Sequence, residues 1–299
     1  MNKLLGALGG NKAADAFRKI VSGDASGAPA WSQQMAIGND AGLFGPDSAV
    51  WEVHGCIATL VGGIRALLMQ AAHPAALTGV AEHSAYDTDP LGRLERTTRW
   101  LTITSFGSTE AIESEARRVR QMHKRVQGSF EDKTGSHLSY SASDPRFLLW
   151  VHCAFTDSFL RAHQELGYPL PQGADRYVNE WAKSAEPLGL ERAPLSKQAL
   201  ADVMKNFADT EITSITMTPP IVGFILKPPF SRSGLFVYRI LANAAISTID
   251  EPFLSVLGLK KRSKIWLKVS RTILDFLSYM LGHESPSQKI ARERIQALQ

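Results

Sequence analysis

The side chains best suited to chemistry in this sequence are a few histidines and arginines on predicted helices. The clearest is His123, in the segment 109–127, TEAIESEARRVRQMHKRVQ. Apolar residues recur there every three or four positions from Ile112 to Val126, and His123 falls on this stripe four residues after Val119. Its imidazole is therefore expected to point inward. Such a ring could be the single protein ligand of a haem iron facing a cavity, or a core histidine that hydrogen-bonds a neighbouring helix.

A second group lies in the segment 89–106, which begins DPLGRLERTTRWL. Arg93, Arg96 and Thr97 are three and four residues apart, so they share one helix face, which Trp100 continues. Two guanidinium groups beside a hydroxyl could bind carboxylates or hydrogen-bond bound oxygen. The alternative is an ordinary solvated basic face.

Two further groups of candidate residues indicate a function less specifically. His152 and Thr156 are stacked four residues apart in VHCAFTDS, where the hydroxyl can simply bond the carbonyl one turn back. His73, Glu82 and His83 lie in AAHPAALTGVAEHSAYDTDP, the segment that leads to the Arg93 helix. Structural roles at helix ends and functional roles both fit these three residues.

The motifs of several large enzyme classes are missing. The sequence has no G-x-G-x-x-G or P-loop, no H-E-x-x-H and no G-x-S-x-G elbow. It also lacks the E-x-x-H pair of di-iron helix bundles. The two cysteines, Cys56 and Cys153, form no CxxC or CxxCH pattern, which favours a reducing compartment and argues against a zinc ribbon or a c-type haem.

Composition and periodicity predict an all-α globular protein. The chain has 299 residues, of which 44% are hydrophobic and 21% charged, as in ordinary globular domains. Helices are predicted at 54–72, 89–106, 109–127, 144–166, 172–188, 195–215, 233–248 and 260–282. The helix over 54–72 is apolar on almost every face, and its Gly62–Gly63 pair allows a bend or a close approach by another helix. The proline-rich run 219–230 is predicted to be a loop or clamp.

We expect one domain behind a short lead-in. Residues 1–44 are rich in Gly, Ala and Ser and predict an irregular or loosely helical segment, whereas 45–299 predict a single helical domain. No signal peptide is recognisable, and no window approaches the roughly 18 apolar residues of a spanning helix. A soluble cytoplasmic protein, at most peripheral at a membrane surface, is expected.

The C-terminal part of the chain is basic. Between Leu259 and Arg294 there are nine Lys or Arg against three Asp or Glu, an excess of six in a chain whose net charge is +4. Within it, the segment 258–281 has a basic head and an apolar continuation. This pattern predicts a helix on a membrane surface, or a core-packed helix whose lysines are solvated. No nucleic-acid recognition motif accompanies these charges, so nucleic-acid binding is not expected.

An ordered series of segments resembles a known family. GPDSAVWEVHG is followed by LLMQAAHPAALTGVAEHSAYDTDPLGRLERTTRWL, then VRQMHKRVQG, then YSASDPRFLLWVHCAFTDSFLRA. Over about 45–190 the chain resembles the MpaB-type and rubber oxygenase (latex-clearing protein) catalytic domain. The resemblance implies a haem b protein with a globin-like helical core around a haem pocket.

The resemblance also implies roles for individual residues. The family's proximal histidine belongs to an arginine-x-x-histidine pattern, which Arg120 and His123 match, so His123 would bind the iron. The distal arginine and threonine match Arg93 and Thr97. Rubber oxygenases have a lysine directly before that threonine, whereas this chain has Arg96, which departs from the family's pattern.

The remaining assignments are weaker. Thr156 is similar to the threonine near the haem edge, His152 is grouped with it as a cofactor-binding residue, and Arg120 would meet a haem propionate. Glu82 is the only nearby candidate for the distal acid. The function implied is a haem-dependent oxygenase that uses O₂ on a small apolar substrate, lipid-like or terpenoid-like. The alternative is a non-catalytic protein, either a haem carrier or sensor or a helical scaffold for an apolar ligand.

Overall fold

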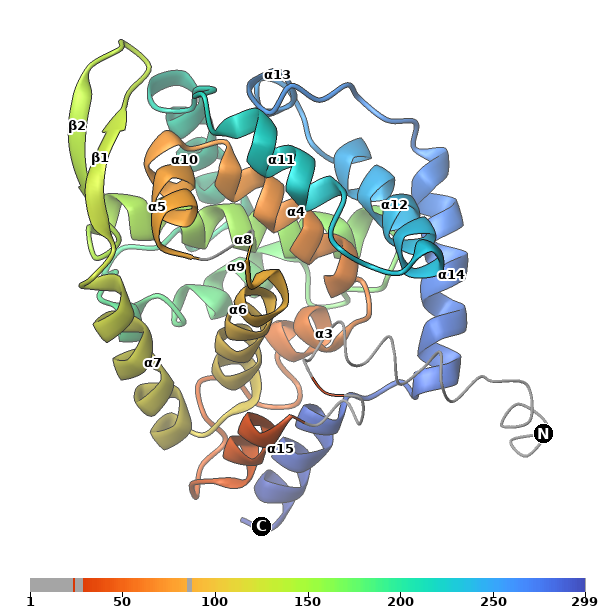
Figure 1. The fold of residues 1–299 in the computed structure, drawn as a ribbon. Helices are drawn as coiled ribbons and strands as arrows, with labels where there is room; N and C mark the ends of the chain where they lie inside the picture. Colours follow the sequence, from red (N-terminus) through yellow and green to blue (C-terminus); the bar gives the residue numbers. More distant parts are fainter. Residues whose placement is uncertain (1–23, 25–28, 85–87, 299) are drawn as a thin grey trace.

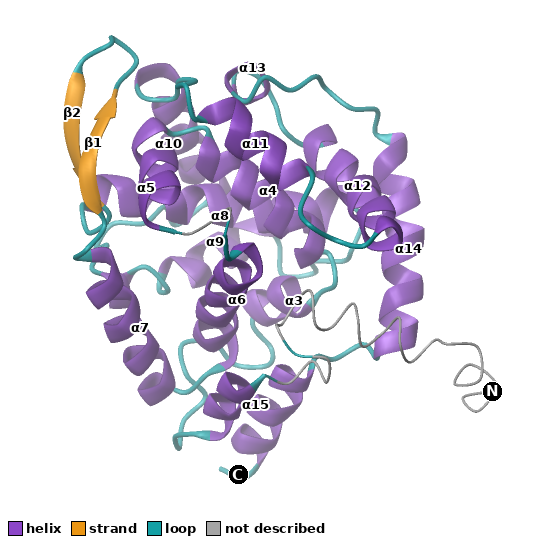
Figure 2. Ribbon diagram, viewed as in Figure 1, coloured by secondary structure: helices purple, strands orange, loops and turns teal. Residues whose placement is uncertain are grey.

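The computed structural model describes residue 24 and residues 29–84 and 88–298. These residues form mostly helices, with one small two-stranded sheet at the edge of the molecule (Figures 1 and 2). The prediction of a mostly helical chain is therefore confirmed, and the sheet is an exception to the all-α prediction. In chain order, the elements are η1 Ala30–Ala36, α3 Ala49–Gly55, α4 Thr59–Ala71, α5 Pro74–His83, α6 Pro90–Phe106, α7 Thr109–His123, β1 Gln127–Glu131, β2 His137–Ser141, α8 Pro145–Glu165, α9 Ala174–Ala182, η2 Glu186–Leu188, α10 Lys197–Thr210, α11 Thr218–Leu226, α12 Arg232–Ser247, α13 Phe253–Val256, α14 Ile265–Leu281 and α15 Pro286–Gln296.

Helices α4 and α8 form the centre of the core. They lie side by side, and the other helices pack around them (Figure 1). Gly62 of α4 makes this close approach possible, because a Cβ atom there would lie 2.7 Å from the Phe159 ring and 3.2 Å from the Phe159 Cα atom of α8. The predicted close approach at Gly62–Gly63 is thus confirmed for Gly62. The space beside Gly63 is open to at least 4 Å.

A buried charge also joins these two helices. Arg65 of α4 is 2% exposed and is held by α8, with its Nη2 atom 2.7 Å from Asp157 Oδ2 and its Nη1 donating to Ser158 Oγ at 2.8 Å. A buried guanidinium is tolerated only when it is paired and hydrogen-bonded. This pair therefore fixes how the two helices are rotated against each other.

The prediction of one continuous helix over 54–72 is wrong for the first turn of that range. The chain instead forms α3 and α4, which are bent by 91° around Cys56. Gly55 ends α3 against Gln288 of α15, where a Cβ atom would lie 2.0 Å from the Gln288 side-chain nitrogen. No single helix among the described residues passes the length and hydropathy test for a membrane span, whereas the bent α3–α4 pair passes it jointly.

The proline-rich segment predicted as a loop or clamp contains a helix instead. In α11, Pro219 and Pro220 occupy the first turn, where the backbone N–H groups have no helical partner and proline is tolerated. Pro228 and Pro229 come after its last residue, Leu226. The prolines bracket the helix rather than prevent it.

The β1–β2 hairpin was not predicted. It pairs Phe130 with Leu138 and Gly128 with Tyr140 in antiparallel register. Each strand buries only one large side chain, Phe130 or Tyr140. The sequence therefore lacks the alternation that identifies a half-buried strand. The two buried rings pack together at 6.3 Å and attach the hairpin to α5.

Part of the expected lead-in packs into the core. Its residues 1–23 and 25–28 lie outside the described part of the chain. Residues Trp31 and Met35 of η1 are buried, and η1 lies against α15 and α6. Arg294 of α15 donates hydrogen bonds to the carbonyls of Met35 and Phe106, which joins the two ends of the described chain.

The α4–α8 contact gives a matched pair of stability tests. Gly62→Ala should lower the free energy of unfolding by about 1–2 kcal/mol, because two packed helices must separate to admit the methyl group. Gly63→Ala should raise it by about 0.5–1 kcal/mol, because the added methyl group meets open space and alanine has a higher helix propensity than glycine. Urea denaturation followed by circular dichroism measures both. Equal effects at the two positions would show that the helices are not in close contact at Gly62.

Candidate functional site

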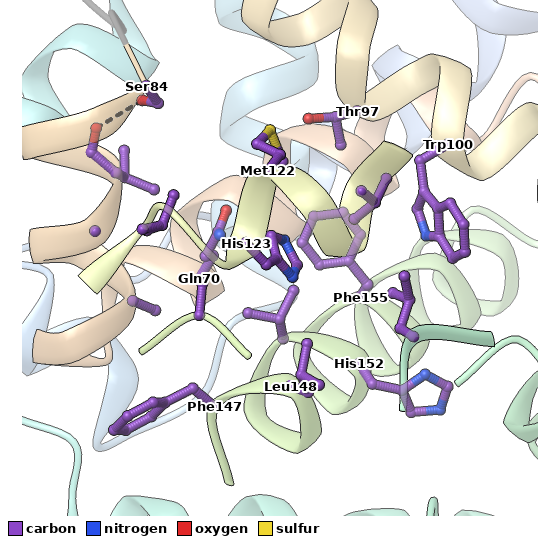
Figure 3. A pocket seen from close by; sticks show the side chains of 18 of the residues that line it. Gln70, Ser84, Thr97, Trp100, Met122, His123, Phe147, Leu148, His152 and Phe155 are labelled. Carbon is purple, nitrogen blue, oxygen red and sulfur yellow. Dashed lines mark hydrogen bonds between the residues drawn. The ribbon is translucent and has the colours of Figure 1, made fainter. Parts of the chain in front are cut away.

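A cavity of about 420 Å³ lies between α5, α6, α7, α8, the hairpin and the segment around η2 (Figure 3). Its volume is in the range of small-molecule sites in proteins. Most of its wall is apolar: Val119, Met122, Val126, Phe147, Leu148, Val151, Phe155, Trp181, Leu188 and Leu190 all contribute. The histidines and arginines that line it are the side chains best suited to chemistry.

His123 is the last residue of α7 and lines the cavity. In Figure 3 its ring is drawn near the middle of the side chains, and Gln70 and Phe155 line the same cavity. It is half-buried, and within the described residues its imidazole has no hydrogen-bond partner. The C-terminal end of a helix favours a protonated histidine, yet burial outweighs this effect and lowers the pKa of His123 below its ordinary value. The ring is therefore neutral at pH 7 and has a free nitrogen lone pair.

His152 of α8 is a second imidazole on the same cavity. It lies at the edge of the group of side chains in Figure 3, farther from the centre than His123. Burial lowers the pKa of His152 to about 4, so this ring is also neutral at pH 7. Its side chain likewise has no hydrogen-bond partner among the described residues. The cavity thus contains two neutral imidazoles, and only a ligand or water could form hydrogen bonds with their ring nitrogens.

Arg93, Arg96 and Thr97 of α6 all line the cavity, so the structure brings together the three residues that the sequence placed on one face. Arg93 is half-buried, and its only polar contact in the described chain is with the Gln70 amide oxygen, at 3.4 Å. Burial, with a smaller contribution from Arg96, lowers the pKa of Arg93 to about 10, which leaves it positively charged at pH 7. Arg93 is therefore a cation without a carboxylate partner in that part of the chain.

The other two side chains of this set are already engaged. Arg96 is 43% exposed and forms an ion pair with Asp89 at 3.3 Å. The Thr97 hydroxyl donates to the Arg93 carbonyl one turn back, at 3.2 Å. Arg93 is thus the residue of α6 most available to a ligand.

The structure places three other predicted site residues away from the cavity wall. Arg120 donates to the Pro187 carbonyl and forms a 2.8 Å ion pair with Glu113. Thr156 is buried and donates to the carbonyl of His152 at 2.6 Å, the internal bond that its spacing allowed. Glu82 is 51% exposed and accepts a 2.9 Å hydrogen bond from the hydroxyl of Tyr140.

The two histidines near Glu82 differ in position. His83, at the end of α5, lines the cavity. His73 caps the start of α5 by accepting from the backbone N–H of Ala75, and its other ring nitrogen lies 2.9 Å from Glu211. The helix-end role considered for His73 is confirmed.

Sequence reasoning missed several residues of the cavity wall, and three of them are informative. Gln70 is a polar residue within an otherwise apolar stretch of α4, and that isolation was a usable signal. Tyr140 reaches the cavity from the unpredicted hairpin, and its hydroxyl connects the wall to Glu82. Trp181 comes from α9 and stacks edge-on against His54 at 4.3 Å. Tyr140 and Trp181 reach the cavity only through tertiary packing, so the local sequence pattern could not identify them.

This arrangement can hold a largely apolar molecule in contact with two neutral imidazoles and one unpaired guanidinium. An imidazole lone pair can bind a metal or accept a proton, and a guanidinium can stabilise negative charge. Within the described residues, no group of three or more His, Cys, Asp or Glu side chains is placed to hold a metal ion. The cavity wall thus presents a largely apolar surface with a few polar side chains.

Comparison with known proteins identifies the chain's family. No curated protein and no solved structure matches the chain. Residues 51–277, well over half of the sequence, match the family described as "ER-bound oxygenase mpaB/B'/Rubber oxygenase, catalytic domain", and α4, α8 and every element around the cavity lie within that match. The chain therefore belongs to this family of oxygenase catalytic domains.

Proposed function

We propose that this protein is a haem b-dependent oxygenase that uses O₂ on an apolar, lipid-like or terpenoid-like substrate. His123 is the proposed iron ligand, and Arg93 and Thr97 line the part of the cavity where oxygen and substrate would meet. The observation that carries the proposal is the imidazole of His123: it is neutral, faces an apolar cavity and has no partner among the described residues.

The side chains around the cavity fit haem better than a bare metal ion. A bare ion needs several protein ligands, and the described residues offer no such cluster. Porphyrin iron brings four nitrogen ligands with it and needs only one or two from the protein. One free imidazole in an apolar cavity meets that requirement. Haem bound there would supply the redox chemistry with O₂ that the side chains alone cannot perform.

The side chains have separate tasks in this proposal. His123 would hold the cofactor from the last turn of α7. Arg93 supplies the positive charge for an anionic atom in the cavity, either a carboxylate of the ligand or an oxygen on which negative charge develops. The apolar wall excludes water and selects an apolar substrate. His152 remains available as a second polar contact.

Haem binding by purified protein tests the iron ligand. The wild-type protein should bind haem in a one-to-one complex with a Soret absorption band. His123→Ala should weaken haem binding about 100-fold or more, because it removes the proposed axial ligand. His152→Ala is the matched control, since it removes another neutral imidazole from the same cavity. It should change the affinity only a few-fold.

Addition of free imidazole should restore the Soret band of a His123→Gly variant if the cavity survives. Equal losses in the His123 and His152 variants, or a loss confined to His152→Ala, would contradict the assignment. Circular dichroism of each variant separates loss of the ligand from loss of the fold.

The pH dependence of haem retention follows from the lowered pKa of His123. An imidazole must be deprotonated to bind iron, and free histidine becomes protonated below about pH 6.5. Because burial lowers the pKa of His123, the lone pair stays available at more acidic pH. Haem should therefore be retained as the pH falls through 6.5 and be lost only below it, as followed by the Soret band. Release with a midpoint at or above about 6.5 would contradict a lowered pKa for His123.

Oxygen uptake tests the activity itself. The haem-loaded protein, supplied with a reductant if its iron is ferric, should consume O₂ in proportion to an added terpenoid alkene such as squalene. Arg93→Leu should lower this rate about 100-fold while retaining the haem, because it removes a cation of the wall that has no carboxylate partner among the described residues. Arg96→Leu is the matched control and should stay within a few-fold, since Arg96 is already paired with Asp89. A haem-loaded protein with no alkene-dependent uptake would favour a carrier or sensor.

A further inference from the structure

Helix α14 has a second apolar face that nothing in the described chain covers. Its inner face buries Leu267, Ser270 and Leu274 against the core. On the opposite side, Ile265, Val269, Phe276 and Tyr279 recur every three to seven residues, which at about 100° per residue puts them on one line. We call these four residues the outer stripe. They are 54%, 38%, 61% and 60% exposed, respectively.

An isolated exposed apolar residue is ordinary on a protein surface, whereas a continuous stripe indicates a contact. The outer stripe extends over nearly all of the 17 residues of α14, about 25 Å at 1.5 Å per residue. In Figure 1, α14 is the outermost helix on its side of the molecule, with α12 between it and α4. Its outer face is therefore not turned toward the cavity or the core.

The stripe has a strongly basic end. Lys260, Arg262 and Lys268, which we call the basic cluster, are exposed at or just before the first turn of α14. None of the three forms an ion pair within the described part of the chain. Lys261 and Lys264 lie among them, each paired with one carboxylate at 2.9 and 3.0 Å. The local charge is thus positive and largely uncompensated.

The charge distribution argues for an anionic partner. Two copies of this chain that met through the stripe would each bring the basic cluster to the contact. The one acidic residue of α14, Asp275, could not balance it, because Asp275 already accepts from Arg271 at 2.8 Å and from Tyr168 at 3.0 Å. An apolar helix face flanked by unpaired cations matches the interface of a bilayer that contains anionic lipids.

We propose that α14 docks this protein on an anionic membrane surface. The outer stripe enters the boundary between headgroups and acyl chains, and the basic cluster contacts lipid phosphates. The helix lies in the plane of the interface and does not cross it. This contact is separate from the cavity and requires neither haem nor an oxygenase activity.

Sedimentation with vesicles tests the proposal on the full-length protein. Binding to phosphatidylcholine vesicles that contain 30% phosphatidylserine should greatly exceed binding to phosphatidylcholine alone. Phe276→Ser with Tyr279→Ser should reduce this binding about tenfold or more, because two buried apolar groups are lost from the interface. Lys260→Gln with Lys268→Gln should reduce it by about fivefold for each charge, and salt should weaken the wild-type binding in the same way.

Matched controls come from other exposed positions. Leu195→Ser removes a 60% exposed leucine outside α14, and Lys183→Gln with Lys197→Gln removes two exposed lysines elsewhere. These variants should bind vesicles like the wild type. Equal binding to neutral and anionic vesicles, no binding to either, or equal effects of the control and α14 variants would overturn the proposal. Analytical ultracentrifugation tests whether a second copy of the chain covers the outer stripe instead. If the Phe276→Ser, Tyr279→Ser variant has a lower molecular mass than the wild type but binds vesicles equally well, the stripe is a dimer interface and the proposal is wrong.

Discussion

The packing of α8 against α4 is the constraint on which the rest of the structure depends. Gly62 lets the two helices approach, and the Arg65–Asp157 pair fixes their rotation. With one side of α8 committed to the core through Trp150 and Cys153, the side that carries Val151, His152 and Phe155 must face the other way, where it forms a wall of the cavity. The core packing thus determines which residues of α8 meet a ligand. A substitution at this contact is expected to disturb the cavity as well as stability.

The contrast between Arg65 and Arg93 distinguishes structural from functional charge. Both are guanidinium groups on helices at the centre of the molecule. Arg65 is bound by a carboxylate and a hydroxyl through its two terminal nitrogens, so its charge is paired within the core. Among the residues that the structure describes, Arg93 has only a 3.4 Å contact with Gln70, and the two imidazoles that line the cavity with it have no hydrogen-bond partner. Unsatisfied polar groups cost stability, and proteins keep them mainly where a ligand supplies the missing partner.

The sequence predicted those features that depend on helix periodicity. The side-chain stripe of α7 placed His123 on the inner face, and the three-and-four spacing of α6 placed Arg93 beside Thr97. Helix α6 has nearly its predicted bounds, whereas α7 ends at His123, four residues before the predicted end at 127, where β1 begins. The prediction failed where tertiary contacts override local pattern. The hairpin is held by single buried rings, the α3–α4 bend depends on Gln288 from a distant helix, and Trp181 reaches the cavity only because α9 packs there. Arg120 shows the same limit, since the Pro187 carbonyl that it binds belongs to a segment 67 residues away.

The proposed role of His123 as the single protein ligand of a haem iron can be tested by pulsed electron paramagnetic resonance of the ferric, haem-loaded protein with ¹⁵N-labelled histidines. We expect the iron to couple to a single histidine nitrogen. This coupling should disappear when position 123 is changed to glycine and persist when position 152 is changed. Coupling that survives the glycine substitution, or a protein that binds no haem in any redox state, would contradict it.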